Sequence, residues 1–224
     1  GLVATGQAST NSIAYKGLHR VASFLYQRAD HVVAVTDAIR DHIVDDWKVP
    51  AERVDVVRAG VEASAFHVLG DSSKHKKRWG FTADTTVSYV GTLGNAHGLE
   101  TVLAAAESLR DSRPDIEFVI AGDGAEGPEL RSMADRLKLS NVRFTGAVER
   151  GDVPSLLAAS DVCLAVLRDD PLFVTVVPTK LYEYMAAGRP IIAAVPGEAS
   201  ELINMAGAGV NVVAGEHRAI ADAV

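Results

Sequence analysis

Phe118-Val-Ile-Ala-Gly-Asp-Gly-Ala-Glu-Gly127 is the stretch that decides the fold. Its first residues continue an apolar run without polar alternation, which is typical of a strand covered on both faces of a sheet. Three glycines follow, and Pro128 suits the first turn of a helix. A buried strand that leads through a glycine-rich turn into a helix is the building unit of a parallel α/β sheet.

The same unit recurs along the chain on both sides of this stretch. We expect strands at residues 86–91, 116–121, 141–145, 161–166, 190–194 and 209–213. Helical patterns lie between them, near residues 98–112, 128–138, 152–159, 179–187, 198–205 and 216–224. Strands that alternate with helices in this way predict an α/β fold with a Rossmann-like, doubly wound parallel sheet.

The preceding residues are organised differently. Only two strands are expected there, at residues 31–36 and 53–58, with helices near residues 12–28 and 38–48. Two parallel strands do not bury themselves, so this segment is predicted to be an incomplete piece of a second α/β domain. We therefore expect the end of an N-terminal domain at residues 1–66, a polar, basic linker at 67–84 and a C-terminal domain at 85–224.

Composition narrows the classes of protein. The 224 residues carry 22 Lys and Arg against 29 Asp and Glu, a net charge of −7, and no long basic run, which argues against a nucleic-acid partner. The single cysteine, Cys163, is expected to be a core residue and rules out an internal disulfide or a cysteine-based zinc site. No apolar run reaches the roughly 18 residues of a membrane span. We expect a cytoplasmic protein.

Open α/β sheets bind ligands beyond the carboxyl ends of their strands, so the turns after the strands are the candidate sites. In the first turn, Gly91, Gly94 and Gly98 allow an anion to approach the backbone at a helix N-terminus. A loop that needs glycine for its geometry alone is the alternative. The second turn, Gly122–Gly127, matches the G-x-G-x-x-G pattern of dinucleotide sites, with Glu149 only approximately at the position of the acidic partner.

The third turn is Pro178-Thr-Lys-Leu-Tyr-Glu-Tyr-Met185. Lys180 lies in the first turn of the expected helix, where a cation alone opposes the helix dipole. Such a lysine, beside free backbone N–H groups at Thr179 and Leu181, indicates a bound anion such as a diphosphate. Glu183 lies on the same helix face, so an ordinary Lys–Glu surface pair is the alternative.

The order of these segments is more specific than any one motif. The matching stretches are residues 29–36, 54–61, 89–105, 118–130, 141–167, 178–194 and 207–224. In this order the chain resembles the C-terminal half of GT-B-fold glycosyltransferases of the retaining family-four type, together with the end of their N-terminal domain. It is most similar to the bacterial amino-sugar transferases of surface polysaccharide and lipopolysaccharide assembly.

The resemblance implies roles for several residues. The family has two glutamates eight positions apart. Glu183 matches the second, which binds the ribose hydroxyls of the donor, a task that suits a carboxylate because it accepts two hydrogen bonds. Thr175 stands at the first, which contacts the donor sugar. Thr92 and His97 stand where the family has an arginine and a lysine for the diphosphate, so these two cations are missing.

We therefore expect Lys180, the N–H groups of residues 179–181, and Gly91 and Gly94 to bind the diphosphate. By resemblance, a uracil-type base rests near Gly122 and Gly124 and the backbone of Val148. The resemblance implies neither a metal nor a cofactor, because the nucleotide sugar is itself a substrate. Asp169-Asp170 is not a D-x-D metal motif and is expected to be a solvated turn.

The expected function is transfer of a sugar from a nucleotide-diphosphate donor, UDP-linked, to a hydroxyl of a lipid-linked or surface glycan, with retention of anomeric configuration. The acceptor site, and peripheral contact with the inner face of the membrane, would belong to the missing part of the N-terminal domain, so these residues alone are expected to be inactive. Two alternatives stay open: an NAD-dependent oxidoreductase that uses the Gly122–Gly127 turn, and a catalytically degenerate scaffold.

Overall fold

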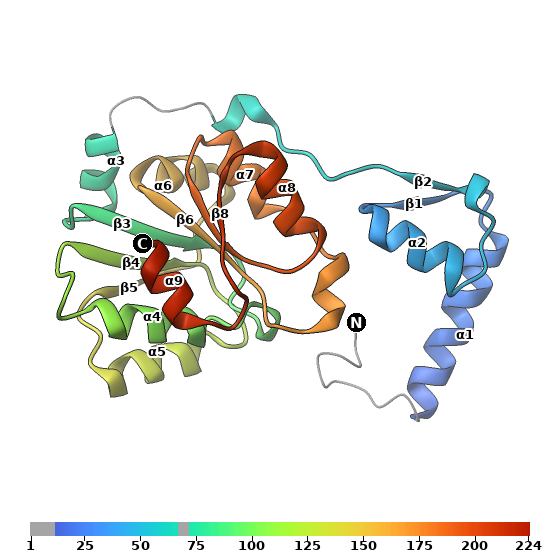
Figure 1. Ribbon diagram of the computed structural model, residues 1–224, viewed down its shortest axis with the longest axis horizontal. Helices are drawn as coiled ribbons and strands as arrows, with labels where there is room; N and C mark the ends of the chain where they lie inside the picture. The colour runs from blue at the N-terminus through green and yellow to red at the C-terminus, as the bar shows by residue number, and fades with distance from the viewer. Residues whose placement is uncertain (1–11, 67–71) are drawn as a thin grey trace.

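The computed structural model describes residues 12–66 and 72–224 and contains a large and a small α/β unit (Figure 1). The large unit is a parallel sheet in the order β5-β4-β3-β6-β7-β8. Its strands are β3 (Thr85–Val90), β4 (Ile116–Ala121), β5 (Val142–Gly146), β6 (Val162–Val166), β7 (Ile191–Ala194) and β8 (Gly209–Asn211). The prediction of a Rossmann-like parallel sheet is confirmed.

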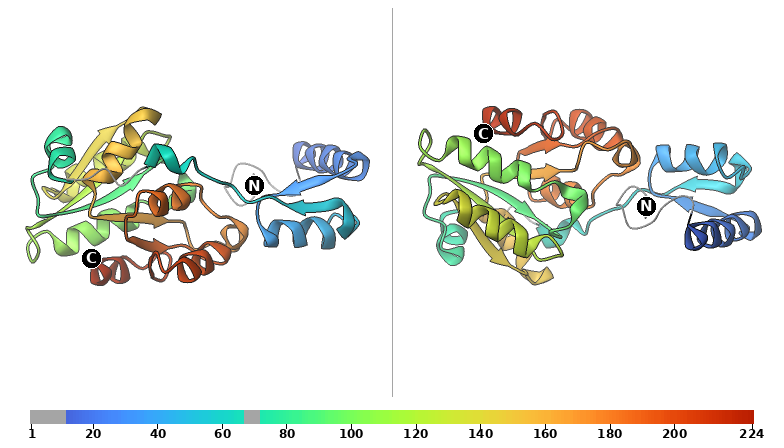
Figure 2. Two further views of the ribbon diagram at one scale, coloured as in Figure 1. Left: turned by 90° about the horizontal axis from the view of Figure 1, so that it is seen from above. Right: turned by 90° about the horizontal axis from the view of Figure 1, so that it is seen from below.

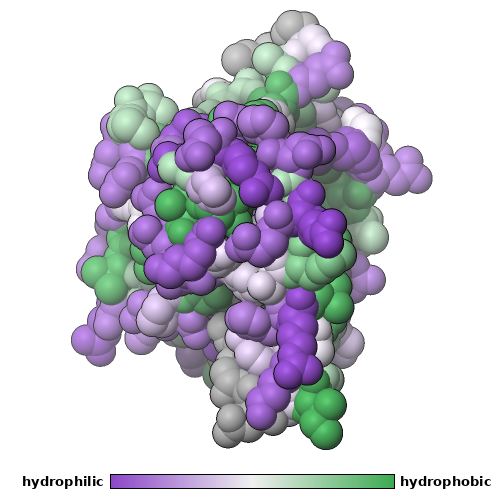
Figure 3. Space-filling model, turned by 90° about the vertical axis from the view of Figure 1, so that its right-hand side faces the viewer, coloured by the Kyte–Doolittle hydropathy of each residue, from purple (hydrophilic) through white to green (hydrophobic). Residues whose placement is uncertain are grey.

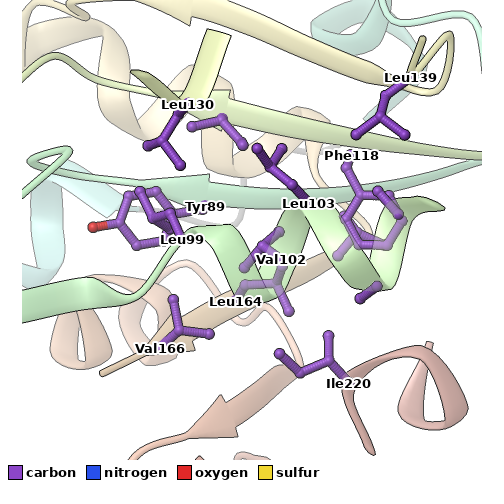
Figure 4. Packing of buried hydrophobic residues seen from close by; sticks show 14 of the residues in the cluster. Tyr89, Leu99, Val102, Leu103, Phe118, Leu130, Leu139, Leu164, Val166 and Ile220 are labelled. Carbon is purple, nitrogen blue, oxygen red and sulfur yellow. The ribbon is translucent and has the colours of Figure 1, made fainter. Parts of the chain in front are cut away.

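Helices cover both faces of this sheet (Figure 2). One face carries α4 (Glu100–Leu109), α5 (Gly127–Leu137) and α9 (His217–Ala223), and the other carries α6 (Val153–Ala159), α7 (Lys180–Ala186) and α8 (Glu198–Ala206). The helix α3 (Ser72–Trp79) packs beside α6. Tyr89, Leu103 and Phe118 are fully buried on the first face (Figure 4). Cys163 is buried on the opposite face, and burial raises the pKa of its thiol.

Short 3-10 turns account for the main differences from the expected elements. The turns η3 (Asn95–His97), η4 (Arg150–Asp152) and η5 (Pro171–Thr175) follow the carboxyl ends of strands β3, β5 and β6. The helix expected from residue 98 begins at Glu100, because Gly98 adopts a left-handed conformation with φ +57°. The expected linker contains the helix α3, and its residues 67–71 lie outside the described residues.

The small unit holds two parallel strands, as expected, β1 (Val32–Ala34) and β2 (Val54–Val56), with α1 (Ile13–Arg28) and α2 (Asp37–Asp45). The turn η1 (Ala51–Arg53) lies between α2 and β2, and η2 (Ala63–Phe66) and α3 follow β2 before the large sheet begins. Large apolar side chains are exposed on this unit, namely Ile13, Leu18, Val21, Phe24, Leu25, Val33, Val35 and Val57. Figure 3 views the molecule from this side and shows hydrophobic patches among polar groups. The division at residues 66 and 84 stays a prediction.

The small unit contacts the large one through the start of α2. The hydroxyl of Thr36 donates to the carbonyl of Thr175 over 2.9 Å. The carboxylate of Glu198, at the start of α8, accepts from the backbone N–H of Asp37 at 3.4 Å and of Ala38 at 3.2 Å. A carboxylate at a helix N-terminus is favoured by the helix dipole. None of the described helices combines the length and apolar character needed to cross a bilayer.

Candidate functional site

A cavity of about 650 Å³ lies at the carboxyl ends of the strands. The chain runs from β3 outward to β4 and β5 and then returns to β6 on the other side of β3, so the sheet reverses its order between β3 and β6. Ligands of open α/β sheets bind at this kind of reversal. The cavity brings together the predicted site residues Gly91, Thr92, His97, Gly122, Val148, Thr179, Lys180 and Glu183.

Lys180 lines this cavity from the first turn of α7. Its Nζ lies 3.7 Å from the centroid of the Tyr89 ring, and a Cβ placed on Gly91 would lie only 2.8 Å from Nζ. The ammonium is buried, and no hydrogen-bond acceptor reaches it from the described part of the chain. Burial lowers the pKa of Lys180 to about 7, and the nearby negative charge of Glu183 offsets this only in part. The side chain thus spans the rim of the sheet toward the first glycine turn.

Glu183 does not form the surface pair with Lys180 that the spacing left open. Its carboxylate oxygen Oε1 instead accepts a short hydrogen bond from Nη1 of Arg150, in η4. The side chain of Glu183 is only 12% exposed, whereas that of Arg150 is 75% exposed. Arg150 also lines the cavity. Sequence reasoning missed it, although its place in the turn after a strand was a usable signal.

His97 is a neutral side chain of the cavity. Its Nδ1 lies 3.3 Å from the carbonyl oxygen of Val166, and since a carbonyl only accepts, this nitrogen carries the proton. Burial lowers the pKa of His97 to about 4, and the charge of Lys180 contributes. The neutral ring therefore offers Nε2 as a hydrogen-bond acceptor. His97 therefore does not supply the positive charge that, by resemblance, a lysine supplies at this position in the family.

Tight backbone packing explains two of the glycines. A Cβ on Gly122 would lie 1.8 Å from the carbonyl oxygen of Gly91, and one on Gly124 would lie 2.4 Å from that of Leu93. The turns after β3 and β4 are also joined by a hydrogen bond from the N–H of Leu93 to the carbonyl of Asp123, at 2.9 Å. Glycine is required here whether or not a ligand is bound, so the pattern Gly122–Gly127 by itself does not indicate a dinucleotide.

Four predicted residues lie outside the cavity wall: Gly94, Gly124, Thr175 and Leu181. The side chain of Leu181 is fully buried in the core, and its N–H donates to the carbonyl of Pro178 over 3.0 Å. The expectation of a free N–H at this position is therefore wrong. The hydroxyl of Thr175 donates to the carbonyl of Leu172 over 3.3 Å. Donor contacts of these four residues stay predictions.

Two further residues stabilise the turns around the cavity. Arg168, just after β6, donates its backbone N–H to Ala96 and its guanidinium to the carbonyl of Asn95, and it pairs with Glu100 at 2.8 Å. The carboxylate of Asp170 accepts from the N–H of Leu172 over 2.8 Å and so caps η5. A capping aspartate fits the turn that we expected for Asp169-Asp170.

The arrangement suits a ligand that joins an anion to a hydroxyl-bearing group. The ammonium of Lys180 has no acceptor among the described residues, and a buried donor left unpaired by the protein suits a site that a ligand completes. The carboxylate of Glu183 and the neutral ring of His97 accept hydrogen bonds nearby. A nucleoside diphosphate offers both kinds of group.

Curated proteins include relatives that align with most of this chain. It is 28% identical over 215 residues to a probable glycosyltransferase, WbjE, of Pseudomonas aeruginosa, a match that covers 94% of this chain and 52% of WbjE. It is 27% identical to an alpha-D-kanosaminyltransferase of Streptomyces kanamyceticus, over 88% of this chain and 51% of that protein. The chain thus spans about half the length of these relatives.

Solved structures share the fold. Anabaena Alr3699/HepE in complex with UDP-glucose is 25% identical, with a TM-score of 0.75, over 91% of this chain and 55% of that one. WaaG, a glycosyltransferase involved in lipopolysaccharide biosynthesis, is 20% identical, with a TM-score of 0.76, over 96% of this chain and 59% of that one.

Two protein-family models match parts of this sequence. "Glycosyltransferase Family 4" matches residues 6–65, and "Glycosyl transferases group 1" matches residues 84–224. The second match covers more than half of the chain and contains the whole cavity. The chain belongs to the glycosyl transferases group 1 family.

Proposed function

We propose that this chain binds the nucleotide-diphosphate donor of a glycosyltransferase, UDP-linked, and that the whole protein transfers its sugar to a hydroxyl of a lipid-linked or surface glycan with retention. The observation that carries the proposal is the buried ammonium of Lys180, which has no acceptor among the described residues and is aimed at Gly91. The complexes of HepE with UDP and with UDP-glucose, and the involvement of WaaG in lipopolysaccharide biosynthesis, support it by analogy.

In the proposed mechanism, Lys180 stabilises the departing diphosphate. As the bond between the anomeric carbon and the diphosphate oxygen breaks, negative charge grows on that oxygen while the sugar gains oxocarbenium character. A positioned cation in a site that excludes water lowers the energy of this charge separation. Glu183 would accept hydrogen bonds from the ribose hydroxyls. His97, being neutral, would accept a hydrogen bond from a hydroxyl group and would not bind phosphate.

Several features of the proposal concern the whole protein. A peripheral contact with the inner face of the membrane and the acceptor site would lie on the N-terminal domain. The exposed valines in and directly after β1 and β2, namely Val33, Val35 and Val57, favour further packing there. We expect these 224 residues to bind the donor and to transfer sugar poorly. The family match gives the dinucleotide hypothesis no support, whereas a degenerate scaffold remains an outcome of the experiment.

Calorimetry with UDP tests the proposal. The Lys180→Ala variant should bind UDP about 10–100-fold more weakly than the wild type, because a charge-assisted hydrogen bond contributes about 1.5–3 kcal/mol. Lys77→Ala, in the exposed part of α3, is the matched control and should bind like the wild type. GDP serves as the comparison for the base. Equal affinity in Lys180→Ala and wild type would remove Lys180 from the site, and no affinity of the wild type for either nucleotide would support the scaffold.

A further inference from the structure

Arg150 has no role in the proposed mechanism, yet its guanidinium lies in the same cavity as Lys180 and Glu183. It belongs to η4, after β5, and reaches across to the first turn of α7, 33 positions further along the chain. Both elements follow strands of the sheet, η4 after β5 and α7 after β6 and η5. This contact therefore joins the turn beside Val148 to the helix that carries Lys180.

The burial of the two partners is unequal. The guanidinium of Arg150 is mostly in water, so the loss of Glu183 would leave it solvated. The carboxylate of Glu183 is almost buried, and a buried carboxylate requires hydrogen-bond donors. Since one partner stays in water, the attraction between the two charges is weakened by solvent. The contact therefore matters chiefly to the buried partner, to which it supplies a donor and a fixed orientation.

Only one oxygen of Glu183 is engaged in the described residues. Arg150 donates to Oε1, and no hydrogen bond within residues 12–66 and 72–224 reaches Oε2. A carboxylate has about four sites for accepted hydrogen bonds. A side chain that is fixed through one oxygen presents the other in a defined direction, and both residues line the cavity.

We propose that Arg150 is a positioning residue that fixes the Glu183 carboxylate through Oε1 so that the remaining sites of the carboxylate accept the ribose hydroxyls of the nucleotide. This inference rests on the proposed function, because it takes Glu183 as the ribose acceptor. Arg150 then determines the preference of the site for a ribose over a sugar without hydroxyls. It acts through Glu183 and makes no contact with the phosphates.

The experiment measures ribose discrimination, the ratio of the Kd of 2′,3′-dideoxy-UDP to the Kd of UDP, by calorimetry on the 224-residue chain. The wild type should discriminate about 10-fold or more. Arg150→Gln should lower this ratio at least about threefold, because it weakens the binding of UDP and not that of dideoxy-UDP. Arg150→Lys should restore part of the wild-type ratio. In a Glu183→Gln background, Arg150→Gln should have no further effect on the ratio, since residues that act as a unit are not additive.

Arg78→Gln is the matched control, because Arg78 pairs at 2.5 Å with Asp152, in the same turn η4, and does not line the cavity. It should leave the ratio unchanged. If the ratio in Arg150→Gln is unchanged, or if both ligands bind equally more weakly, the inference is overturned. The proposed function still stands in that case, provided that the wild type binds UDP. Wild type that binds UDP without discrimination also overturns the inference. If GDP binds and UDP does not, the same ratio is measured with GDP and 2′,3′-dideoxy-GDP. If neither nucleotide binds, the proposed function fails as well.

Discussion

The ammonium of Lys180 lies 3.7 Å above the ring of Tyr89, and no acceptor among the described residues reaches it. A cation over an aromatic face is attracted by the ring, but the contact supplies no hydrogen bond. The hydroxyl of Tyr89 is itself engaged, since it donates to the carbonyl of Thr92 over 2.7 Å. The pair therefore fixes the place of the lysine without satisfying its charge.

This unsatisfied charge should cost stability in the free protein. The pKa of Lys180 is about 7 in the folded chain and near 10.5 when unfolded, so the unfolded state binds more protons between these values and the lysine makes stability rise with pH. Lys180→Met removes this rise. The gain in unfolding free energy of Lys180→Met over the wild type, from urea titrations, should therefore be larger at pH 6 than at pH 9, by about 1–3 kcal/mol. Lys77→Met is the control, and an equal gain at both pH values would contradict the burial of the charge.

UDP binding should take up a proton at Lys180. A bound diphosphate raises the pKa of the lysine above its free value of about 7, so affinity is greatest where the lysine is charged and falls as pH rises above that value. His97, with a pKa of about 4, and Tyr89, whose pKa burial raises, keep their charge states between pH 7.5 and 9. Phosphate titrates near 6 and is already ionised there.

We expect the affinity of the wild type to fall by up to about tenfold per pH unit between pH 7.5 and 9, and that of Lys180→Met to stay flat. Calorimetry in buffers of different ionisation enthalpy should detect proton uptake with the wild type alone. If the two proteins show the same pH profile, the titrating group is not Lys180.

Sequence patterns predicted the large sheet well, because its central strands β4, β3, β6 and β7 are buried on both faces, and the runs in β4, β6 and β7 are almost wholly apolar. They also indicated Lys180 as a candidate site residue, because a cation in the first turn of a helix opposes the helix dipole. This conflict involves only neighbouring residues, so it can be recognised in the sequence. The 3-10 turns were not predictable in this way, since short loops carry no periodicity. The ends of the elements differ from the expected ones by up to three residues.

The partners of the site residues depend on contacts between distant segments. Glu183 pairs with Arg150, and the spacing i, i+3 with Lys180 gave no hint of this. Similarly, Gly122 and Gly124 are explained by the neighbouring turn after β3, which only the order of strands brings close. At Leu181 a local contact was missed instead. Its N–H donates to the carbonyl of Pro178, three residues earlier, whereas we expected this N–H to be free at the start of the helix.

Gly122→Ala should lower the free energy of unfolding by disturbing the turns at the rim of the cavity. Its φ is +139° and the added Cβ would meet the carbonyl of Gly91 at 1.8 Å, so the turns after β3 and β4 must separate. We expect a loss of about 2 kcal/mol or more in unfolding free energy, measured in urea. Gly60→Ala, where nothing lies within 4 Å of the new Cβ, should change stability by less than about 0.5 kcal/mol. Similar values for both variants would refute the close packing of the two turns.

Glu198 should protect the first turn of α2. Its carboxylate accepts from the N–H groups of Asp37 and Ala38 and lies 3.6 Å from Arg58, so it joins α8 to the small unit. Loss of a carboxylate at a helix N-terminus costs about 0.3–1 kcal/mol. In Glu198→Ala, amide hydrogen exchange at residues 37 and 38 should accelerate about two- to fivefold relative to the wild type, and Glu198→Gln should fall between them.

Glu201→Ala, one turn further along α8, is the matched control, because Glu201 is exposed and accepts from neither amide. Exchange at residues 37 and 38 should then remain at the wild-type rate. If Glu198→Ala leaves these amides equally protected, the two units are held together by Thr36 and its bond to the carbonyl of Thr175 instead. In that case Thr36→Val, which keeps the shape of the side chain, should accelerate exchange at residues 37 and 38, because it removes both the donor to the carbonyl of Thr175 and the hydroxyl that caps α2 by accepting from the N–H of Ile39.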